Sequence, residues 1–245
     1  MRFGTLTFRE IRERVDEGWL AIVPTGCTDQ QGPHLTVDFD TWLAGELCLA
    51  AAQRGADQYG LQALVLPVLP FGPTPEHRNY GSGYIDIPQE LHAGVVSAML
   101  DSLIEQGFQR LVVWRGCGGH RLGQVVERFN CSCQGQARVF LPDQPYARIW
   151  DAVAPNIPGG HADSFSASLA LYLRPHAVRQ DRIPHPETKL VDWDDPDLDF
   201  TRYSSSGVIG DPTHATRELG VTLGAILVES VALIFKELAE TTLAG

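Results

Sequence analysis

The sequence predicts an α/β fold: a three-layer α/β/α sandwich around a mainly parallel central sheet. Short apolar runs rich in β-branched residues alternate along the chain with longer segments of helical periodicity. Strands separated by helices of ten or more residues form βαβ units, and the helices of such units cover both faces of a parallel sheet. No Ser/Gly-rich linker, charge block or internal repeat marks a boundary, so we expect a single domain over residues 1–245.

The strands and helices follow from the period of the apolar residues. The expected strands are residues 19–24, 63–69, 110–114 and 137–141. The expected helices are residues 41–54, 88–106, 119–129, 164–173 and 216–239. Residues 173–210 differ from the rest, because they are rich in proline, aspartate and other polar residues. That composition is typical of a long surface excursion, which would serve as a lid or as an oligomer contact.

Composition excludes several classes of partner. The net charge is −11 and the lysines are only Lys189 and Lys236, which argues against binding to a nucleic-acid backbone. No apolar run approaches the roughly 20 residues of a membrane helix, and the start of the chain does not read as a signal peptide. The five cysteines, an odd number, fit reduced thiols in a cytoplasm. We expect a cytoplasmic protein that binds a small molecule, with no nucleic acid and no membrane as partner.

Polar residues gather where the expected strands end. The segment 29–34, Asp-Gln-Gln-Gly-Pro-His, follows the first strand, and Asp40 comes shortly after it. Ligands of α/β folds bind beyond the carboxyl ends of the strands, and two carboxylates in such a loop can hold a cation. Asp29 and Asp40 can equally form an Asx-turn and cap the helix that begins at Thr41.

A glycine-rich loop follows the third strand. It contains Cys117, Gly118 and Gly119, and a helix is expected directly after it. Glycines at this point let backbone N–H groups face developing negative charge. A thiol held there is either a metal ligand or nucleophile with a lowered pKa, or a small packed residue.

Two further polar clusters complete the set. His161 precedes the fourth helix and could act as a general acid or base, with Asp163 or Ser164 capping that helix. Glu76 and His77 follow the second strand. All of these clusters follow a strand or open a helix, so we expect them to converge on one rim of the sheet.

The order of these motifs resembles that of the creatininase family of metal-dependent amidohydrolases. The family's motif G-S-x-E-Q-H-G-P-H-L-P is similar to residues 26–36, with Asp40 at the aspartate that follows. Its E-H and G-T elements are similar to residues 76–77 and 81–82, and its N-G-H-G-G-N loop to residues 115–120. Its H-A-G-E-x-E-T-S and G-x-x-G-D-P-x-x-A-T motifs are similar to residues 161–168 and 207–216.

The resemblance implies a creatininase-like fold and hydrolysis of a C–N bond in a small cyclic amide or formamide-type substrate. It also implies a homo-oligomer, often a hexamer. In the family a glutamate, an aspartate and the loop histidine hold one metal, and these positions are Asp29, Asp40 and Cys117 here. Each of the three is still a competent ligand, and the thiolate favours zinc, with iron possible, over manganese or magnesium.

The second metal set of the family is degenerate in this chain. It keeps Asp40, but Gln31 replaces a histidine. Where a glutamate is expected, the residues are Gly119, Ser164 and Ser166. A neutral amide and a hydroxyl do not offset a divalent charge as an imidazole and a carboxylate do. We therefore expect one divalent transition metal per chain.

The leading hypothesis is a hydrolase with one catalytic metal, held by three protein ligands and open to water. His161 would carry a proton to the leaving nitrogen, and the N–H groups of Gly118 and Gly119 would stabilise the oxyanion. The residues expected to contact substrate are Glu76, His77, Arg115, His120 and His34.

Two alternatives stay open at this point. The chain could be an inactive creatininase-like binding or assembly protein, because several motif positions are substituted. It could also be a metal-free hydrolase with Cys117 as nucleophile and His120 or His161 as base. Arg115 would either repel a metal ion or clamp an anionic substrate.

Overall fold

The computed structural model describes residues 1–133, 135–187 and 189–243. Its central sheet has four strands in the order β2-β1-β3-β4, and every pair is parallel. The strands are β1 (Leu20–Thr25), β2 (Ala63–Val65), β3 (Arg110–Arg115) and β4 (Arg138–Phe140). Ile22 of β1 pairs with Val65 on one side and with Val112 on the other, so β1 and β3 form the centre of the sheet.

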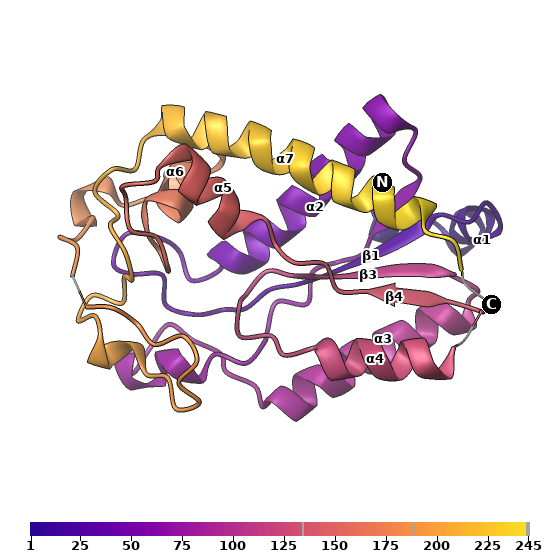
Figure 1. The fold of residues 1–245 in the computed structure, drawn as a ribbon, viewed down its shortest axis with the longest axis horizontal. Coiled ribbons are helices and arrows are strands. Elements are labelled where there is room, and N and C mark those ends of the chain that lie inside the picture. Colours follow the sequence, from indigo (N-terminus) through magenta and orange to yellow (C-terminus); the bar gives the residue numbers. More distant parts are fainter. Residues whose placement is uncertain (134, 188, 244–245) are drawn as a thin grey trace.

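Helices cover both faces of this sheet, as Figure 1 shows, with α2 and α7 on one face and α3 and α4 on the other. The α-helices of the described residues are α1 (Phe8–Asp16), α2 (Phe39–Tyr59), α3 (Gln89–Glu105), α4 (Gly123–Ser132), α5 (Tyr146–Val153), α6 (Ser164–Leu173) and α7 (Arg217–Glu240). The predicted α/β/α sandwich with a parallel sheet is therefore confirmed.

Alternate residues of β1 enter two separate hydrophobic cores. Leu20 and Ile22 pack with apolar side chains of α2, α6 and α7. Ala21 and Val23 pack with those of α3 and α4 on the opposite face. All six residues of β1 are buried, which explains why this strand reads as a continuous apolar run rather than an alternating one.

The sequence missed two helices and misplaced some ends. α1 begins at a capping box in which Thr7 and Glu10 bond reciprocally, a signal present in the sequence as T-x-x-E. α5 was also missed, although Ile149 and Trp150 give it a buried face. α4 begins at Gly123 rather than at residue 119, because His120 is buried and the glycine-rich loop extends past it.

Helix α7 is long and apolar enough to cross a membrane by length and composition alone, with a mean hydropathy of 1.9 in its most apolar window. In this fold it is a core helix. Leu223, Leu227, Val231 and Phe235 are each at most 1% exposed and belong to the core on the α2 face. Its first turn is capped by Thr216, whose hydroxyl accepts a hydrogen bond from the backbone N–H of Leu219 at 3.1 Å.

Helices α6 and α7 approach closely at Gly220. A Cβ at this position would lie 2.0 Å from the carbonyl oxygen of Ser168, a backbone atom that moves only if α6 moves. We predict that Gly220→Ala lowers the free energy of unfolding by roughly 1–3 kcal/mol, measured by denaturant titration.

The matched control is Gly94→Ala in α3, where no atom lies within 4 Å of the added Cβ. Removing a glycine from an open helix position should raise the free energy of unfolding by about 0.5–1 kcal/mol. Equal effects of the two substitutions would contradict the close contact between α6 and α7.

Candidate active site and metal centre

A wide cleft of about 1360 Å³ lies beyond the carboxyl ends of β1 and β3. Its walls come from the loop after β1, the first turns of α2, the 3-10 helix η2 (Pro75–Tyr80), the loop after β3 and the segment before α6. Residues 193–200 and Arg202 form a further wall. The cleft therefore occupies the place where the topology of a parallel α/β sheet concentrates ligand binding.

Four potential metal ligands converge at the floor of this cleft. The sulfur of Cys27 lies 3.2 Å from Oδ2 of Asp29 and 3.2 Å from Oδ2 of Asp40. The sulfur of Cys117 completes a group whose ligand atoms all lie within 4.8 Å of one another. The structure thus brings together Asp29, Asp40 and Cys117, and it adds Cys27, which the sequence analysis did not single out. The available signal was that Cys27 stands at the serine of the motif G-S-x-E.

Close backbone contacts hold these residues in place. The hydroxyl of Thr41 in α2 donates to the carbonyl oxygen of Cys27 at 2.8 Å, so the first turn of α2 is tied to the loop after β1. A Cβ at Gly26 would lie 2.5 Å from Cα of Thr41, and only glycine permits this approach. Asp40 is consequently a residue of the first helical turn that faces the cleft, and it is not the helix cap.

The charges of the cluster repel one another. Burial, together with the charge of Asp40, raises the pKa of Asp29 well above its usual range. Burial also raises the pKa of Asp40 to about 6. A hydrogen bond with Cys117 is the largest cause of a raised pKa at Cys27, and burial is the next largest. Two sulfurs and two carboxylates gathered around one point are the donors that a zinc ion prefers, so these residues fit one borderline divalent metal ion.

Gln31 has taken a different role from the histidine of the family motif. Its side-chain amide donates to Oδ1 of Asp29 at 2.6 Å, and the residue is 1% exposed. Gln31 therefore orients a carboxylate of the cluster through its amide nitrogen, which has no lone pair for a metal.

Two histidines form the adjoining wall. The rings of His77 and His161 lie 4.8 Å apart between centroids, and the ring of Phe200 packs against both. The backbone of His161 exchanges hydrogen bonds with Ile209 at 2.8 and 2.9 Å, which fixes its position. Burial lowers the pKa of His77 to about 2 and that of His161 to about 4. Both imidazoles are therefore neutral at pH 7, and each presents one donor and one acceptor.

Other predicted residues also line the cleft. Glu76 follows Pro75 in η2, and its carboxylate lies 3.6 Å from Nε2 of His77. Gly118 and Gly119 also line the cleft, and neither N–H is bonded to another group within the described residues. Asp163 caps α6, because its side chain accepts from the backbone N–H of Ser166 at 3.2 Å. The sequence alone allows either Asp163 or Ser164 as this cap, and the structure has Asp163.

Three residues expected to contact substrate do not reach the cleft wall. His34 and His120 are 0% exposed. His120 nevertheless lies beside the ligand cluster, because one of its ring nitrogens is within 4.8 Å of the sulfurs of Cys27 and Cys117. Nδ1 of His120 lies 2.9 Å from the hydroxyl of Thr25, and the His120 ring packs against His92 with centroids 4.4 Å apart. Arg115 is half-buried, pairs with Asp143 at 3.9 Å and is not among the residues that line the cleft.

The segment from residue 193 to 202 covers one side of the site, which fits the lid alternative for this region. Trp193 packs edge-on against Phe200 with centroids 5.7 Å apart. Asn79 of η2 donates to Asp199 at 2.7 Å, which ties the segment to the opposite wall.

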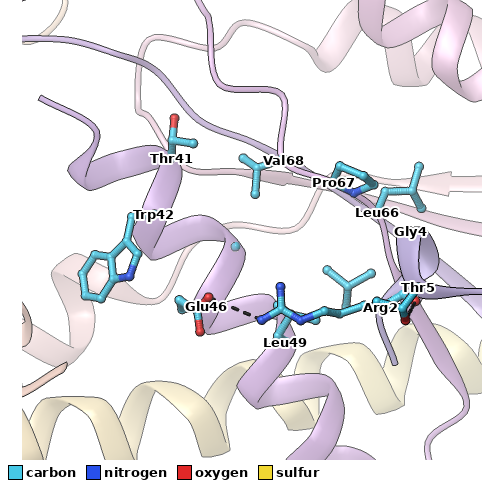
Figure 2. A pocket seen from close by; sticks show the side chains of 12 residues that line it. Arg2, Gly4, Thr5, Thr41, Trp42, Glu46, Leu49, Leu66, Pro67 and Val68 are labelled. Atoms are coloured by element: carbon cyan, nitrogen blue, oxygen red, sulfur yellow. Dashed lines mark hydrogen bonds and ion pairs between the residues drawn. The ribbon is translucent and has the colours of Figure 1, made fainter. Parts of the chain in front are cut away.

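A second, smaller pocket of about 390 Å³ lies between the N-terminal segment, α2 and the residues after β2 (Figure 2). Its charged side chains, Arg2 and Glu46, form an ion pair at 3.6 Å, which Figure 2 shows as a dashed line. No group of potential metal ligands lies there among the described residues. We therefore assign the chemistry to the larger cleft.

Comparison with known proteins identifies the family. The family model of creatininase, creatinine amidohydrolase, matches residues 4–235. The chain belongs to the creatininase family. It is 26% identical to creatinine amidohydrolase of Pseudomonas putida over 255 aligned residues, which cover 96% of this chain and 95% of that protein. It is 30% identical to the mycofactocin precursor peptide peptidase of Mycobacterium ulcerans, over 85% of this chain and 81% of that protein.

Solved structures show the same fold. A manganese form of creatininase superposes with a TM-score of 0.82 at 22% identity, covering 98% of this chain and 99% of that one. A creatininase variant of the Zn–Zn type superposes with a TM-score of 0.84 at 22% identity, covering 98% of each chain. The creatininase-like fold and family expected from the motifs are thus confirmed, and the family is one of metal-dependent amidohydrolases.

The buried His92 of α3 makes stability depend on pH. Neither of its ring nitrogens has a hydrogen-bond partner among the described residues, and burial lowers its pKa to about 4. The unfolded chain takes up this proton near pH 6.5, so the unfolded state binds more protons than the native state between these values. The contribution of His92 to stability is therefore complete above pH 6.5 and is lost as the pH falls toward 4.

We predict that His92→Phe, which keeps an aromatic ring in the core, reduces the fall in the free energy of unfolding between pH 7 and pH 5 by roughly 1–3 kcal/mol. Denaturant unfolding at pH 7, 6 and 5 measures the effect. His185→Phe is the control, because His185 is exposed. An unchanged slope for His92→Phe would contradict the assignment of a buried neutral imidazole.

Proposed function

We propose that this chain is a single-metal hydrolase that cleaves a C–N bond in a small cyclic amide or formamide-type substrate. The observation that carries the proposal is the group of four converging donor atoms from Cys27, Asp29, Asp40 and Cys117, whose ligand atoms all lie within 4.8 Å of one another. This group lies in the same cleft as a pair of neutral histidines and two unbonded glycine N–H groups. A ligand set, a proton carrier and an oxyanion site are the parts that metal-assisted amide hydrolysis requires.

The metal would be held by Asp29, Asp40 and Cys117, with Cys27 as an additional thiolate. When bound, a zinc ion supplies Lewis acidity, which polarises a carbonyl group and lowers the pKa of water. A thiolate donor set favours zinc or iron over manganese and magnesium. The chain would therefore differ in metal preference from the manganese form of creatininase with which it shares its fold.

The protein's own residues supply the remaining steps. His161, fixed by its backbone pairing with Ile209, moves a proton to the leaving nitrogen. Gly118 and Gly119 line the cleft, and their N–H groups would bind the oxygen that becomes negative during attack on the carbonyl. Glu76 and His77 bind polar atoms of the substrate, and the aromatic ring of Phe200 keeps water from the two imidazoles.

Cleft size favours a second candidate substrate class. A volume of about 1360 Å³ exceeds the usual range of roughly 300–1,000 Å³ for small-molecule pockets. One relative is named as a precursor peptide peptidase, so a short peptide amide is the alternative. A panel of cyclic amides, N-formyl amines and short peptides, assayed with zinc and after chelation, separates the two. Peptide cleavage alone would replace the small-ring proposal.

The metal-free alternative has less support. A hydrogen bond with Cys27 lowers the pKa of Cys117, yet burial and the neighbouring carboxylates outweigh it and leave this pKa above the ordinary value. A protonated thiol is a weak nucleophile. His120, one of the two bases considered for it, lies within 4.8 Å of the Cys117 sulfur, but burial lowers its pKa to about 3 and makes it a weak base. Absence of turnover with any substrate in the panel would favour the inactive binding protein instead. A cytoplasmic location stays a prediction from the sequence, and a homo-oligomer stays a prediction from the family resemblance.

The thiolate ligands can be counted directly. We predict one metal per chain by elemental analysis, and a sulfur-to-metal charge-transfer band after substitution with Co²⁺. Cys117→Ser and Cys27→Ser should each reduce this band and weaken metal binding, because a hydroxyl is a far poorer ligand than a thiolate.

Cys131→Ser is the matched control, because Cys131 is exposed and outside the cluster. Its band should equal that of the wild type. Two metals per chain, or a band that survives both cluster substitutions, would refute the donor set.

His161 has a separate test. His161→Ala should reduce kcat by about 10²–10⁴-fold, because proton transfer to the leaving group is lost. Metal content and the unfolding midpoint should stay at wild-type values. Equal turnover in the variant would assign His161 to packing against Phe200 alone.

A further inference from the structure

Asp29, His77 and His161 form a second group close enough to hold a metal ion, since one ligand atom from each lies within 4.8 Å of the others. Proximity alone does not make a site, because a neutral imidazole binds a metal only through the nitrogen that has no proton. The question is therefore which ring nitrogen of each histidine carries the proton. Gln30, whose side chain lies between the two rings, decides it.

The side-chain amide of Gln30 has only one possible orientation. Its Oε1 accepts from the backbone N–H of Gly32 at 2.9 Å, and its Nε2 donates to the carbonyl oxygen of Gly207 at 2.9 Å. A backbone N–H only donates and a carbonyl only accepts, so rotating the amide by 180° would lose both bonds. Gln30 is 8% exposed, and neither bond could be replaced readily by water.

The absence of a side chain at Gly207 leaves the space that this amide occupies. Its φ of +85° favours glycine, and a Cβ at this position would lie 1.9 Å from Oε1 of Gln30. The amide therefore sits directly against the backbone of the loop before Ile209, the residue that pairs with His161. The same loop therefore positions both Gln30, through Gly207, and His161, through Ile209.

The fixed amide determines the tautomer of His77. Nδ1 of His77 lies 3.1 Å from Nε2 of Gln30, a donor, so Nδ1 must accept and carry the lone pair. The proton of the neutral ring is then on Nε2, which lies 3.5 Å from Oδ2 of Asp29. A protonated His77 would set its Nδ1–H against the N–H of Gln30, so this contact also disfavours the charged ring.

The main chain of Gln30 determines the tautomer of His161. Nε2 of His161 lies 2.7 Å from the carbonyl oxygen of Gln30, which accepts only, so Nε2 carries the proton. Nδ1 of His161 then holds the lone pair, on a residue that lines the cleft.

We propose that Gln30 is a positioning residue that sets both tautomers. It makes His77 a hydrogen-bond donor through Nε2–H and makes His161 a proton acceptor through Nδ1. His77, with its Nε2–H directed at Asp29, is then unable to bind a metal through that atom. The group of Asp29, His77 and His161 is therefore a hydrogen-bonding subsite in which Nδ1 of His161 accepts from an N–H or O–H group of the substrate or of water. The inference deepens the proposed function by giving the two histidines opposite roles at named atoms.

Long-range ¹H–¹⁵N spectra of histidine-labelled protein, as purified and at pH 7, report tautomers directly. His77→Asn and His161→Asn identify the two sets of signals. We expect both rings as neutral Nε2–H forms. A neutral Nδ1–H form or a charged imidazolium for His77 overturns the proposal, and it does so without any variant of Gln30.

Gln30→Glu tests the cause. The carboxylate offers no N–H to His77, so the proton of His77 should move from Nε2 to Nδ1, while His161 keeps its Nε2–H form because its partner is a main-chain carbonyl. Gln30→Met, which has no polar group, should leave His77 distributed over both tautomers.

Gln53→Glu is the matched control, since Gln53 is exposed on α2 and its side chain bonds to the exposed Asp57. Both tautomers should match the wild type. Unchanged signals of His77 in a folded Gln30→Glu variant would overturn the proposal. These spectra need no substrate, so a failure of the hydrolase proposal, seen as no turnover, is distinguishable from a failure of this one.

Discussion

The close approach of the loop after β1 to the first turn of α2 is the contact on which the site depends. Gly26 lies against Thr41, and the Thr41 hydroxyl holds the carbonyl of Cys27. This contact sets the floor of the cleft, because it presents Cys27 from the loop and Asp40 from the helix to the same point. The backbone N–H of Gly116 donates to the carbonyl of Thr25 at 2.6 Å and brings the loop of Cys117 alongside.

The cost of this geometry is electrostatic. Asp29 and Asp40 are gathered with two thiols in a buried site, and their pKa values rise because charge is unfavourable there. A buried cluster of this kind is destabilising unless a cation or a proton offsets it. The histidines face the opposite constraint, since burial keeps His77 and His161 neutral. The cleft therefore combines a floor that attracts a cation with a wall that donates and accepts protons.

The sequence predicted the fold well, because the buried strands and the period of helices α2, α3, α6 and α7 leave few alternatives. It missed α1 and α5, which are short and carry small apolar faces. The convergence of Asp29, Asp40 and Cys117 was predictable, because parallel strands bring their carboxyl ends to one edge. The inward turn of His34 and His120 was not, because a motif gives the position of a residue along a loop and not the direction of its side chain.

Cys27 and Gln30 were missed for different reasons. Cys27 replaces a serine in the family motif. A single cysteine does not indicate a metal site, and only the structure shows that Cys117 lies beside it. Gln30 matches the motif and so drew no attention, yet its partners Gly32 and Gly207 are separated by 175 positions in the chain. Family membership fixes the scaffold of this protein, whereas the residues that set its metal preference and its proton positions are specific substitutions and contacts. Gln31 shows how the two connect under the proposed function: its amide donates to Asp29, the remaining donors suit a single ion, and His161 is the residue proposed to transfer the proton.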